Sequence, residues 1–231
     1  MKFLYENLEF GYDDLSSSTT TGGRHYNTPE GKYPSVTTVL SILSEESIAA
    51  WRKRVGEDEA EKIGYRARTR GTAVHSIIER YLKNEDINKS EWPPHIVQSF
   101  LNVKPILDNK LGKIYGIEKA LYSKYLGLAG RVDCVGEWEG VPSIIDFKTS
   151  RKTKKKEWIE NYFIQESAYA IMFEERTGLP IPNIVTLIDV DNDSPQIFVE
   201  HRDNWTKKLL KTIEEYKQRK FWNLTQTRGG M

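Results

Sequence analysis

The spacing of apolar side chains divides the chain into a first part with helical periodicity and a second part rich in strand-forming residues. Between Ser35 and Leu107, apolar residues recur at intervals of three and four, which is the spacing of amphipathic helices. From Ile114 onward, β-branched and aromatic residues dominate several segments, and these residues favour strands. We therefore expect a mostly helical part followed by a part that contains a sheet.

The first part is predicted to hold four helices. They are a helix capped by Ser35 that ends by Leu43, a second over Glu46 to Lys62, a third from near Thr69 through Leu82, and a fourth over Ile96 to Leu107 with Pro105 near its end. The segment before Pro34 is expected to be a loose hairpin or an extended segment. Its run from Ser16 to Gly23, SSSTTTGG, has the composition of a flexible loop.

The second part is predicted to be a strand meander followed by alternating helices and strands. The strands are Ile114 to Tyr125, Leu128 to Trp138, Ser143 to Thr149, Asn183 to Val190 and Pro195 to His201, and the helices are Glu157 to Arg176, closed by Gly178, and Trp205 to Trp222. A turn at Asp191-Asn192-Asp193 separates the last two strands. This order predicts an α/β fold with a mixed central sheet flanked by helices. We expect one domain over residues 1–231, mostly helical in 1–112 and sheet-containing in 113–231.

The segment from Gly130 to Ser150, GRVDCVGEWEGVPSIIDFKTS, is the most informative part of the chain. A hairpin turn centred on Glu139 and Gly140 would pair residues whose numbers sum to 279. Asp133 would then face Asp146, and Arg131 would face Lys148. Alternation along the strand puts Lys148 on the face of Asp146, and turns Ile145 and Phe147 toward a core. A slip of one residue would separate these faces.

Two opposed carboxylates suggest a metal site. Like charges directly opposite each other destabilise a sheet, and a divalent cation bound by both would reverse the repulsion. Hard carboxylate oxygens suit Mg²⁺ or Mn²⁺. The alternative is a surface salt bridge, because an Asp, an apolar residue and a Lys at a strand end are common without any catalytic role.

Composition narrows the possible chemistry. Cys134 is the single cysteine, which excludes an intrachain disulfide, a Cys₄ iron–sulfur cluster and a zinc ribbon, and fits a reducing cytoplasm. We expect it to be a small buried hydrophobe. The 34 basic and 33 acidic residues give a net charge of +1, so the placement of charge carries more information than its sum. No apolar run approaches the length of a membrane span, and we expect no membrane partner and no secretion.

Two pairs of polar residues lie four positions apart on predicted helices. Gly71 and His75 share one helix face, and His75 is either a metal ligand, better suited to Mn²⁺ than to Mg²⁺, an orienting group, or an ordinary core or capping histidine. Gln165 and Tyr169 lie beside an apolar stripe. They either form a clamp that contacts a phosphate or supports Lys148, or they are a solvated glutamine and a core tyrosine with its hydroxyl at the rim.

A basic segment follows directly after the strand that carries Asp146. It comprises Arg151, Lys152, Lys154, Lys155 and Lys156, followed by Trp158 and Tyr162. Cations interleaved with aromatic rings bind single-stranded nucleic acid through phosphate contacts and base stacking. Arg66 and Arg70 would form an opposite wall. The alternative is a solvated loop, which is what most charge runs are.

Five blocks of sequence together resemble a known family. They are YPSVTTVL at Tyr33 to Leu40, RGTAVH at Arg70 to His75, IEKALYSKYLGLAGRVDC from Ile117, IIDFKTS from Ile144, and Gln165 with Tyr169. In this order they resemble the PD-(D/E)xK nucleases, in the RecB-like branch, and particularly the mitochondrial genome maintenance exonucleases with their phage and bacterial relatives. The resemblance covers most of the chain from Tyr33 onward and implies a restriction-endonuclease-like core.

The resemblance also implies roles for individual residues. His75, Asp133, Asp146 and the Phe147 carbonyl match metal ligands, Lys148 matches the catalytic lysine, and Glu118, Gln165 and Tyr169 match supporting positions. Many RecB-like relatives hold an iron–sulfur cluster through four cysteines, which this chain lacks, as do the mitochondrial-type enzymes. We see no amphipathic, Arg-rich presequence of the kind that targets proteins to mitochondria. We therefore expect the protein to act in the cytoplasm of a bacterium or of a phage-infected cell.

These observations predict a Mg²⁺- or Mn²⁺-dependent DNA exonuclease that hydrolyses phosphodiester bonds on single strands or strand ends, in DNA repair, replication or recombination. Asp133, Asp146 and Lys148 would be its catalytic residues. Two alternatives stay open. One is a nucleic-acid-binding accessory module without turnover, and the other is a structure-specific endonuclease that uses the same site.

Overall fold

The computed structural model describes residues 2–228, and the side chains of residues 2–222. Its centre is a five-stranded sheet in the order β4-β5-β6-β7-β8. The strands are β4 (Leu111–Ser123), β5 (Leu128–Trp138), β6 (Val141–Ser150), β7 (Asn183–Val190) and β8 (Gln196–His201). β6 and β7 are parallel, and the other neighbouring strands of this sheet are antiparallel. This mixed sheet flanked by helices confirms the predicted α/β class.

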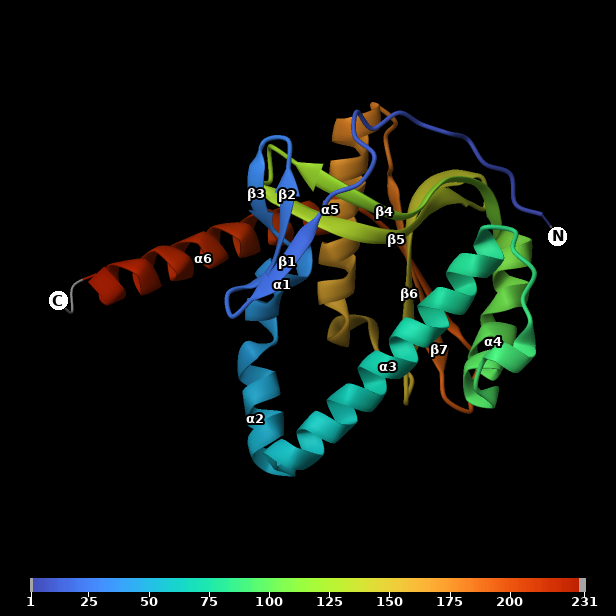
Figure 1. Ribbon diagram of the computed structural model, residues 1–231, viewed down its shortest axis with the longest axis horizontal. Helices are drawn as coiled ribbons and strands as arrows, with labels where there is room; N and C mark the ends of the chain where they lie inside the picture. The colour runs from blue at the N-terminus through green and yellow to red at the C-terminus, as the bar shows by residue number, and fades with distance from the viewer. Residues whose placement is uncertain (1, 229–231) are drawn as a thin grey trace.

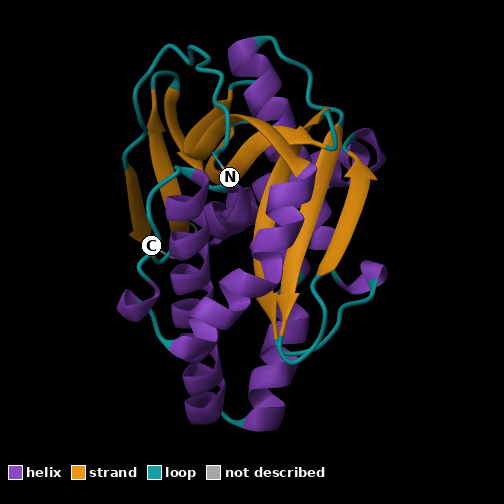
Figure 2. Ribbon diagram, turned by 90° about the vertical axis from the view of Figure 1, so that its right-hand side faces the viewer, coloured by secondary structure: helices purple, strands orange, loops and turns teal. Residues whose placement is uncertain are grey.

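Helices cover both faces of the central sheet (Figure 1 and Figure 2). One face carries α3 (Glu57–Leu82) and α4 (Pro94–Lys110), and the other carries α5 (Glu160–Thr177) and α6 (Asp203–Arg228). Ile145 and Phe147 pack in the cluster with α3 and α4, whereas Ile144 packs in the cluster with α5. The alternation along β6 therefore supplies both cores, as predicted for Ile145 and Phe147.

The chain before the first helix forms a second, three-stranded sheet. Its strands are β1 (Ser17–Thr20), β2 (Gly23–Thr28) and β3 (Gly31–Pro34), in that order and antiparallel. The prediction of a flexible loop for Ser16 to Gly23 is thus wrong. Threonine favours strands, and pairing with β2 orders a run whose composition alone resembles a linker. Ser35 then caps α1 (Val36–Leu40), as predicted, by accepting a hydrogen bond of 3.0 Å from the Thr38 amide.

A pair of long helices forms an arch that extends beyond the sheet (Figure 1). After the short η1 (Ser41–Leu43), α2 (Glu45–Val55) descends to Gly56, and α3 returns as one continuous helix to Leu82. The predicted division into Glu46–Lys62 and a helix from Thr69 is wrong. Gly56, with a φ of 87°, turns the chain where a side chain would be strained. Between Glu57 and Arg70 few residues are apolar, so periodicity gives no signal, although the residues are good helix formers.

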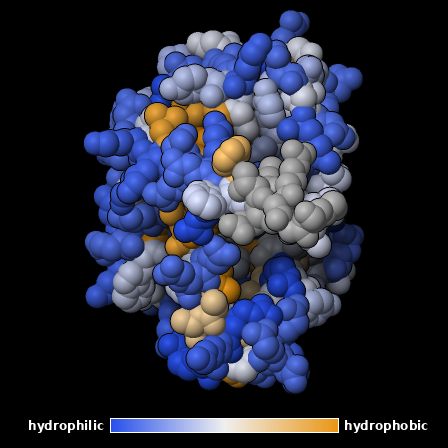
Figure 3. All heavy atoms as spheres, turned by 90° about the vertical axis from the view of Figure 1, so that its left-hand side faces the viewer, coloured by the Kyte–Doolittle hydropathy of each residue, from blue (hydrophilic) through white to orange (hydrophobic). Residues whose placement is uncertain are grey.

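The other predicted elements match the structure closely. β5 and β7 have the predicted bounds. α5 ends at Gly178 in the left-handed conformation, with a φ of 73°. η2 (Lys89–Glu91) and η3 (Lys156–Trp158) are single turns that the sequence pattern does not predict. Within residues 2–228, no helix combines the length and the apolar character that crossing a membrane requires, and the face in Figure 3 is mostly hydrophilic.

Candidate active site

The β5–β6 hairpin has the predicted register. Cα partners run from Trp138 and Val141 to Cys134 and Ile145, so every pair sums to 279. Glu139 and Gly140 have φ values of 50° and 83°, as a type I′ turn requires. The backbone ladder ends at Cys134 and Ile145. Beyond it, the Phe147 amide donates to the side chain of Asp133, at 2.9 Å from Oδ2. The Asp133 side chain therefore reaches across to the β6 backbone one residue past Asp146.

Arg131 does not face Lys148, and that prediction is wrong. Arg131 lies opposite Ala120 of β4, and its guanidinium makes a bidentate pair with Asp14 at 2.8 and 2.9 Å. The β5–β6 ladder ends at Cys134 and Ile145, so it does not bring the two cations opposite each other. Arg131 also donates to the Glu118 carbonyl, which ties it to the neighbouring strand instead.

Asp146 and Lys148 form a buried ion pair on β6. The side chain of Asp146 is 2% exposed and that of Lys148 is 21% exposed. Gln165 of α5 donates to Asp146 Oδ1 at 3.3 Å, while Lys148 contacts Oδ2. The Lys148 ammonium also lies 5.1 Å from the centre of the Tyr162 ring. Asp146 and Lys148 are two residues apart on β6 and share one face, as the alternation predicts. Gln165 and Tyr162 of α5 contact them there.

His75, Glu118 and Asp133 converge from three elements next to this pair. His75 projects from α3, with Nδ1 at 3.5 Å from Asp133 Oδ1. One possible ligand atom from each of the three residues lies within 4.8 Å of the other two. Glu118 is in the left-handed region with a φ of 49°, and Arg131 holds its carbonyl. Among the described residues, these are the three acidic or imidazole side chains grouped closely enough to share one cation.

The charges of this site are strongly coupled. Burial lowers the pKa of His75, but the Asp133 carboxylate outweighs burial and raises that pKa to about 9. Burial likewise opposes the charge of Asp133, yet His75 and Lys148 keep the pKa of Asp133 below its ordinary value. Burial raises the pKa of Asp146. Burial and the Asp133 charge together raise the pKa of Glu118 to about 7. Closely spaced carboxylates that repel one another in this way are what a cation relieves.

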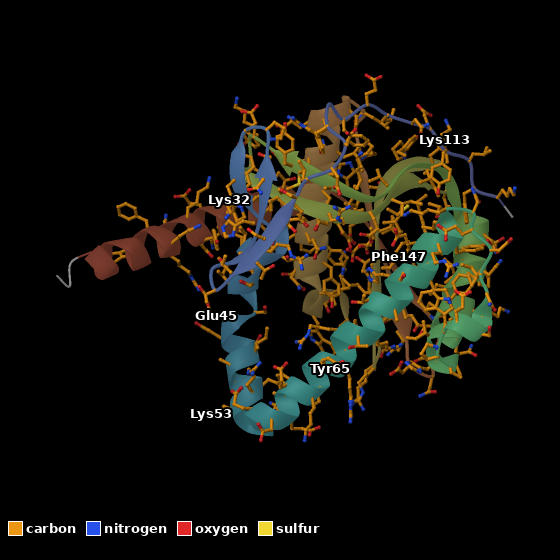
Figure 4. The ribbon with its side chains drawn as sticks, viewed as in Figure 1. Lys32, Glu45, Lys53, Tyr65, Lys113 and Phe147 are labelled. Atoms are coloured by element: carbon orange, nitrogen blue, oxygen red, sulfur yellow. The ribbon has the colours of Figure 1, made fainter. Side chains whose placement is uncertain are left out.

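Phe147 contributes its ring to the core and its backbone to the site. Phe147 is 4% exposed and belongs to the same core cluster as Cys134, which is also buried. His75 meets the ring edge-on, with 6.3 Å between ring centres. Figure 4 shows Phe147 behind the upper half of α3, whereas Tyr65 lies on the lower, arching half. The aromatic contact fixes the side of α3 that His75 presents to the sheet.

Tyr169 lies deep under β5, not at a rim. It is 3% exposed, and a Cβ added at Gly130 would lie 2.6 Å from Tyr169 Cε1. Glycine at position 130 therefore admits the ring. Gln165, one helical turn before Tyr169, is the member of the pair that reaches Asp146. The spacing of four places both residues on the side of α5 that faces the site.

Glu166 is a buried acid that the sequence pattern does not identify. It is fully buried beside the site, and Thr186 donates to its Oε1, whereas its Oε2 is buried with no hydrogen-bond partner. Thr186 is the partner of Asp146 across the parallel β6–β7 ladder. Burial, reinforced by Asp146, raises the pKa of Glu166 well above 4.5. An acid next to Gln165 on an amphipathic helix gives no sequence signal of burial.

Glu166→Gln is expected to stabilise the protein at high pH more than at low pH. Since the folded-state pKa of Glu166 is raised, the wild type has its full stability below pH 4.5 and loses stability as the pH rises toward that raised value. Gln does not titrate and still accepts from Thr186. Each pH unit over which only the folded state stays protonated is worth about 1.4 kcal/mol. Urea unfolding at pH 5 and pH 8 measures the difference, with Glu160→Gln on the surface of α5 as control. Equal differences at both pH values would contradict the expectation.

Beside the acidic site, α3 and the segment after β6 line a cavity of about 950 Å³. The α3 wall is one helix face, and the opposite wall is the end of β6 with the basic segment. The lining residues include Glu59, Ile63, Arg66, Ala67 and Arg70 on α3, and Thr149, Ser150, Arg151, Lys152 and Lys154 opposite. We call this cavity the basic cleft. It brings Arg66 and Arg70 across from the basic segment, as the sequence predicts.

The remaining predicted nucleic-acid contacts have different surroundings. Lys155 lies 5.3 Å from the ring centre of Trp158, which is 65% exposed. Lys156 instead pairs with Glu200 at 2.5 Å, and Tyr162 lies against Lys148. The basic segment therefore divides into residues that line the basic cleft, an exposed aromatic platform, and a lysine held by β8.

Comparisons with known proteins agree with the resemblance seen in the sequence. Mitochondrial genome maintenance exonuclease 1 of Xenopus tropicalis is 27% identical over 209 residues, which cover 82% of this chain and 59% of that protein. The human protein of the same name is 26% identical over 206 residues, covering 81% and 59%. A crystal structure of a Eubacterium rectale protein overlaps 65% of each chain with a TM-score of 0.45 and 14% identity. No family model matches the chain.

The predicted resemblance to mitochondrial genome maintenance exonucleases is thus confirmed. It extends over four fifths of this chain, whereas the chain spans about three fifths of the length of these relatives.

Proposed function

We propose that this protein is a divalent-metal-dependent deoxyribonuclease that hydrolyses phosphodiester bonds at the ends of DNA strands, preferentially single strands. The observation that carries the proposal is the buried Asp146 paired with Lys148, next to Asp133, which accepts from the Phe147 amide, and beside the basic cleft. A cation between carboxylates, an amine beside it and a cationic channel are what hydrolysis of a phosphodiester needs. The name shared by the similar proteins, exonuclease, supports the same reaction.

The donor atoms of the site fit a hard cation. Carboxylate oxygens with an imidazole nitrogen suit Mn²⁺, and carboxylates with a carbonyl oxygen suit Mg²⁺. His75, Glu118 and Asp133 lie close enough together to hold the ion, and Asp146 and the Phe147 carbonyl would complete its ligands from β6. When bound, such an ion lowers the pKa of a coordinated water and neutralises charge on the phosphate.

Lys148 would stabilise the charge that develops on the scissile phosphate. Its ammonium is fixed by Asp146 and by the face of the Tyr162 ring, so little reorientation is needed as charge develops. Gln165 holds the other oxygen of Asp146 and keeps that carboxylate in place. Both contacts come from α5, which makes this helix the support of the reacting groups.

The basic cleft would hold the substrate strand next to the reacting groups. Arg66, Arg151, Lys152 and Lys154 line it, and none of them makes an ion pair with another residue of the part of the chain whose side chains are described. Cations without acidic partners are available for phosphates. Trp158, exposed and covered on one face by Lys155, offers a surface on which an unpaired base stacks. An unpaired base is what distinguishes a single strand from a duplex here.

End-labelled DNA tests the proposal directly. The wild type and Asp146→Ala are incubated with single-stranded, double-stranded and closed circular single-stranded DNA, in Mg²⁺, in Mn²⁺ and in chelator. We expect metal-dependent release of mononucleotides or short oligonucleotides from single-strand ends, absent in chelator and in the variant. Cleavage of the circular strand would favour an endonuclease. Metal-independent binding without products would favour an accessory module and overturn the proposal.

A further inference from the structure

The two arginines on the cleft face of α3 have different partners. Arg70 donates to Asp189 at 2.8 Å and pairs with Asp191, both from the end of β7 and its following turn. Asn102 of α4 donates to the other oxygen of Asp189 at 3.0 Å, and Ser99 Oγ lies 3.4 Å from Arg70. Arg66, one turn earlier, has no such acid pair among the residues with described side chains. We call the set of Arg70, Asp189, Asp191 and Asn102 the latch.

The latch lies where α3 leaves the body of the protein. C-terminal to Arg70, α3 is packed on the sheet through Val74, Ile77, Ile78 and Leu82, whereas N-terminal to it Ala60 is the one buried residue. The latch joins α3, α4 and β7 at this boundary. His75 follows Arg70 by five residues on the same unbroken helix. If the contacts of Arg70 did not hold α3, a tilt of the arch would move His75 and change its 3.5 Å contact with Asp133.

We propose that Arg70 is a positioning residue that fixes α3 and hence His75, and that Arg66 is the arginine of α3 that contacts a substrate phosphate. The inference rests on the proposed nuclease function. Asp189 is 2% exposed, and each of its two carboxylate oxygens accepts a hydrogen bond, one from Arg70 and one from Asn102. The guanidinium of Arg70 is therefore engaged by groups of the protein itself. Contacts from both α4 and β7 fix the position of the Arg70 guanidinium. A side chain that moves to bind a phosphate would not need them.

The two roles predict effects on different quantities for a change at Asp189. If Arg70 bound phosphate, Asp189→Asn would release a cation and remove a negative charge near the cleft, and DNA binding would tighten. If Arg70 positions α3, the same change loosens the helix that carries His75, and turnover falls while binding does not improve. A displacement of about 1 Å in a reacting group lowers a rate by about 10²-fold.

Steady-state release from end-labelled single-stranded DNA separates the two roles. For Asp189→Asn we expect kcat to fall at least about tenfold with KM within about twofold of the wild type. For Arg66→Gln we expect kcat to be retained, KM to rise, and the salt dependence of binding to lose about 0.7 of a unit in slope, as for one lost phosphate contact on a single strand. Tighter binding by Asp189→Asn with unchanged kcat would overturn the proposal.

A milder variant and a structural readout keep the test decisive. Asp191 is 38% exposed, so Asp191→Asn folds even if Asp189→Asn does not, and it should show a smaller fall in kcat with the same unchanged KM. Hydrogen exchange of the amides of residues 71–78 should be faster in both variants than in the wild type. If the wild type itself releases nothing from DNA, the proposed function fails, and exchange at the wild-type rate would then separately overturn the latch.

Discussion

Replacing Asp146 by Asn is expected to lower strand-end release by at least about 10³-fold, or about 4 kcal/mol of transition-state stabilisation. The substitution preserves the size of the side chain and leaves an oxygen that accepts from Gln165, but it removes one of the carboxylate charges that would hold the cation. It also removes the partner of Lys148. The initial rate on end-labelled single-stranded DNA in Mg²⁺ and in Mn²⁺ measures the loss.

Binding of DNA by this variant should be unchanged or tighter. The cations of the basic cleft lie on α3 and on the segment after β6, and removing a buried negative charge beside them lowers the repulsion felt by a phosphate. A dissociation constant measured in chelator separates this effect from turnover. Lost cleavage with retained binding would show that Asp146 serves turnover and not the capture of DNA.

Asp193→Asn is the matched control for Asp146→Asn. Asp193 lies in the exposed β7–β8 turn, where it accepts from the Ser194 amide at 2.7 Å, so the same chemical change is made away from the site. Its activity should equal that of the wild type. A cleavage rate for Asp146→Asn above about a tenth of the wild-type rate, in a folded protein, would show that Asp146 is not part of the reacting group.

The β5–β6 hairpin could be predicted because its information is local. Alternation of side chains and a Glu139-Gly140 turn define the register within about twenty residues, and a positive φ at both turn residues gives the strands the twist that they need. The identity of the face shared by Asp146 and Lys148 follows from the same alternation. What the hairpin pattern could not give is the end of the ladder at Cys134 and Ile145, beyond which the Asp133 side chain bonds the Phe147 amide.

The arch and the latch could not be predicted, since their information is not local. The polar sequence from Glu57 to Arg70 buries almost nothing, so no periodicity reports a helix there. Arg70 and Asp189 are 119 positions apart, and nothing in either segment names the other. The sequence therefore suggested that Arg70, five residues before His75, contacts a phosphate. The fold instead places Asp189 and Asp191 against it.

The positions of two acids near the site could not be predicted from the sequence pattern either. Glu118 was expected only to support the site, but its carboxylate lies with His75 and Asp133 because Arg131 holds its backbone in a left-handed conformation. Glu166 gave no signal, because helical spacing identifies burial through apolar residues, and a glutamate on the buried side of α5 breaks that rule. Such exceptions concentrate where a site needs charge in a dry environment.

Gly130→Ala is expected to destabilise the protein by about 2 kcal/mol or more, which corresponds to about 4–8 °C in Tm for a chain of this size. The added Cβ would lie 2.6 Å from Cε1 and 3.0 Å from the hydroxyl of Tyr169. Tyr169 is 3% exposed, so its ring has no free space to move into. Urea unfolding followed by circular dichroism measures the loss.

Gly116→Ala is the control for Gly130→Ala, because the new Cβ would lie 3.5 Å from its nearest neighbour, Lys119 Cβ, which is an ordinary contact. Its stability should stay within about 0.5 kcal/mol of the wild type. In a double-mutant cycle, Tyr169→Leu should cancel much of the cost of Gly130→Ala, since the clash requires the ring. If the two costs simply add in that cycle, the Tyr169 ring is not what requires glycine at position 130.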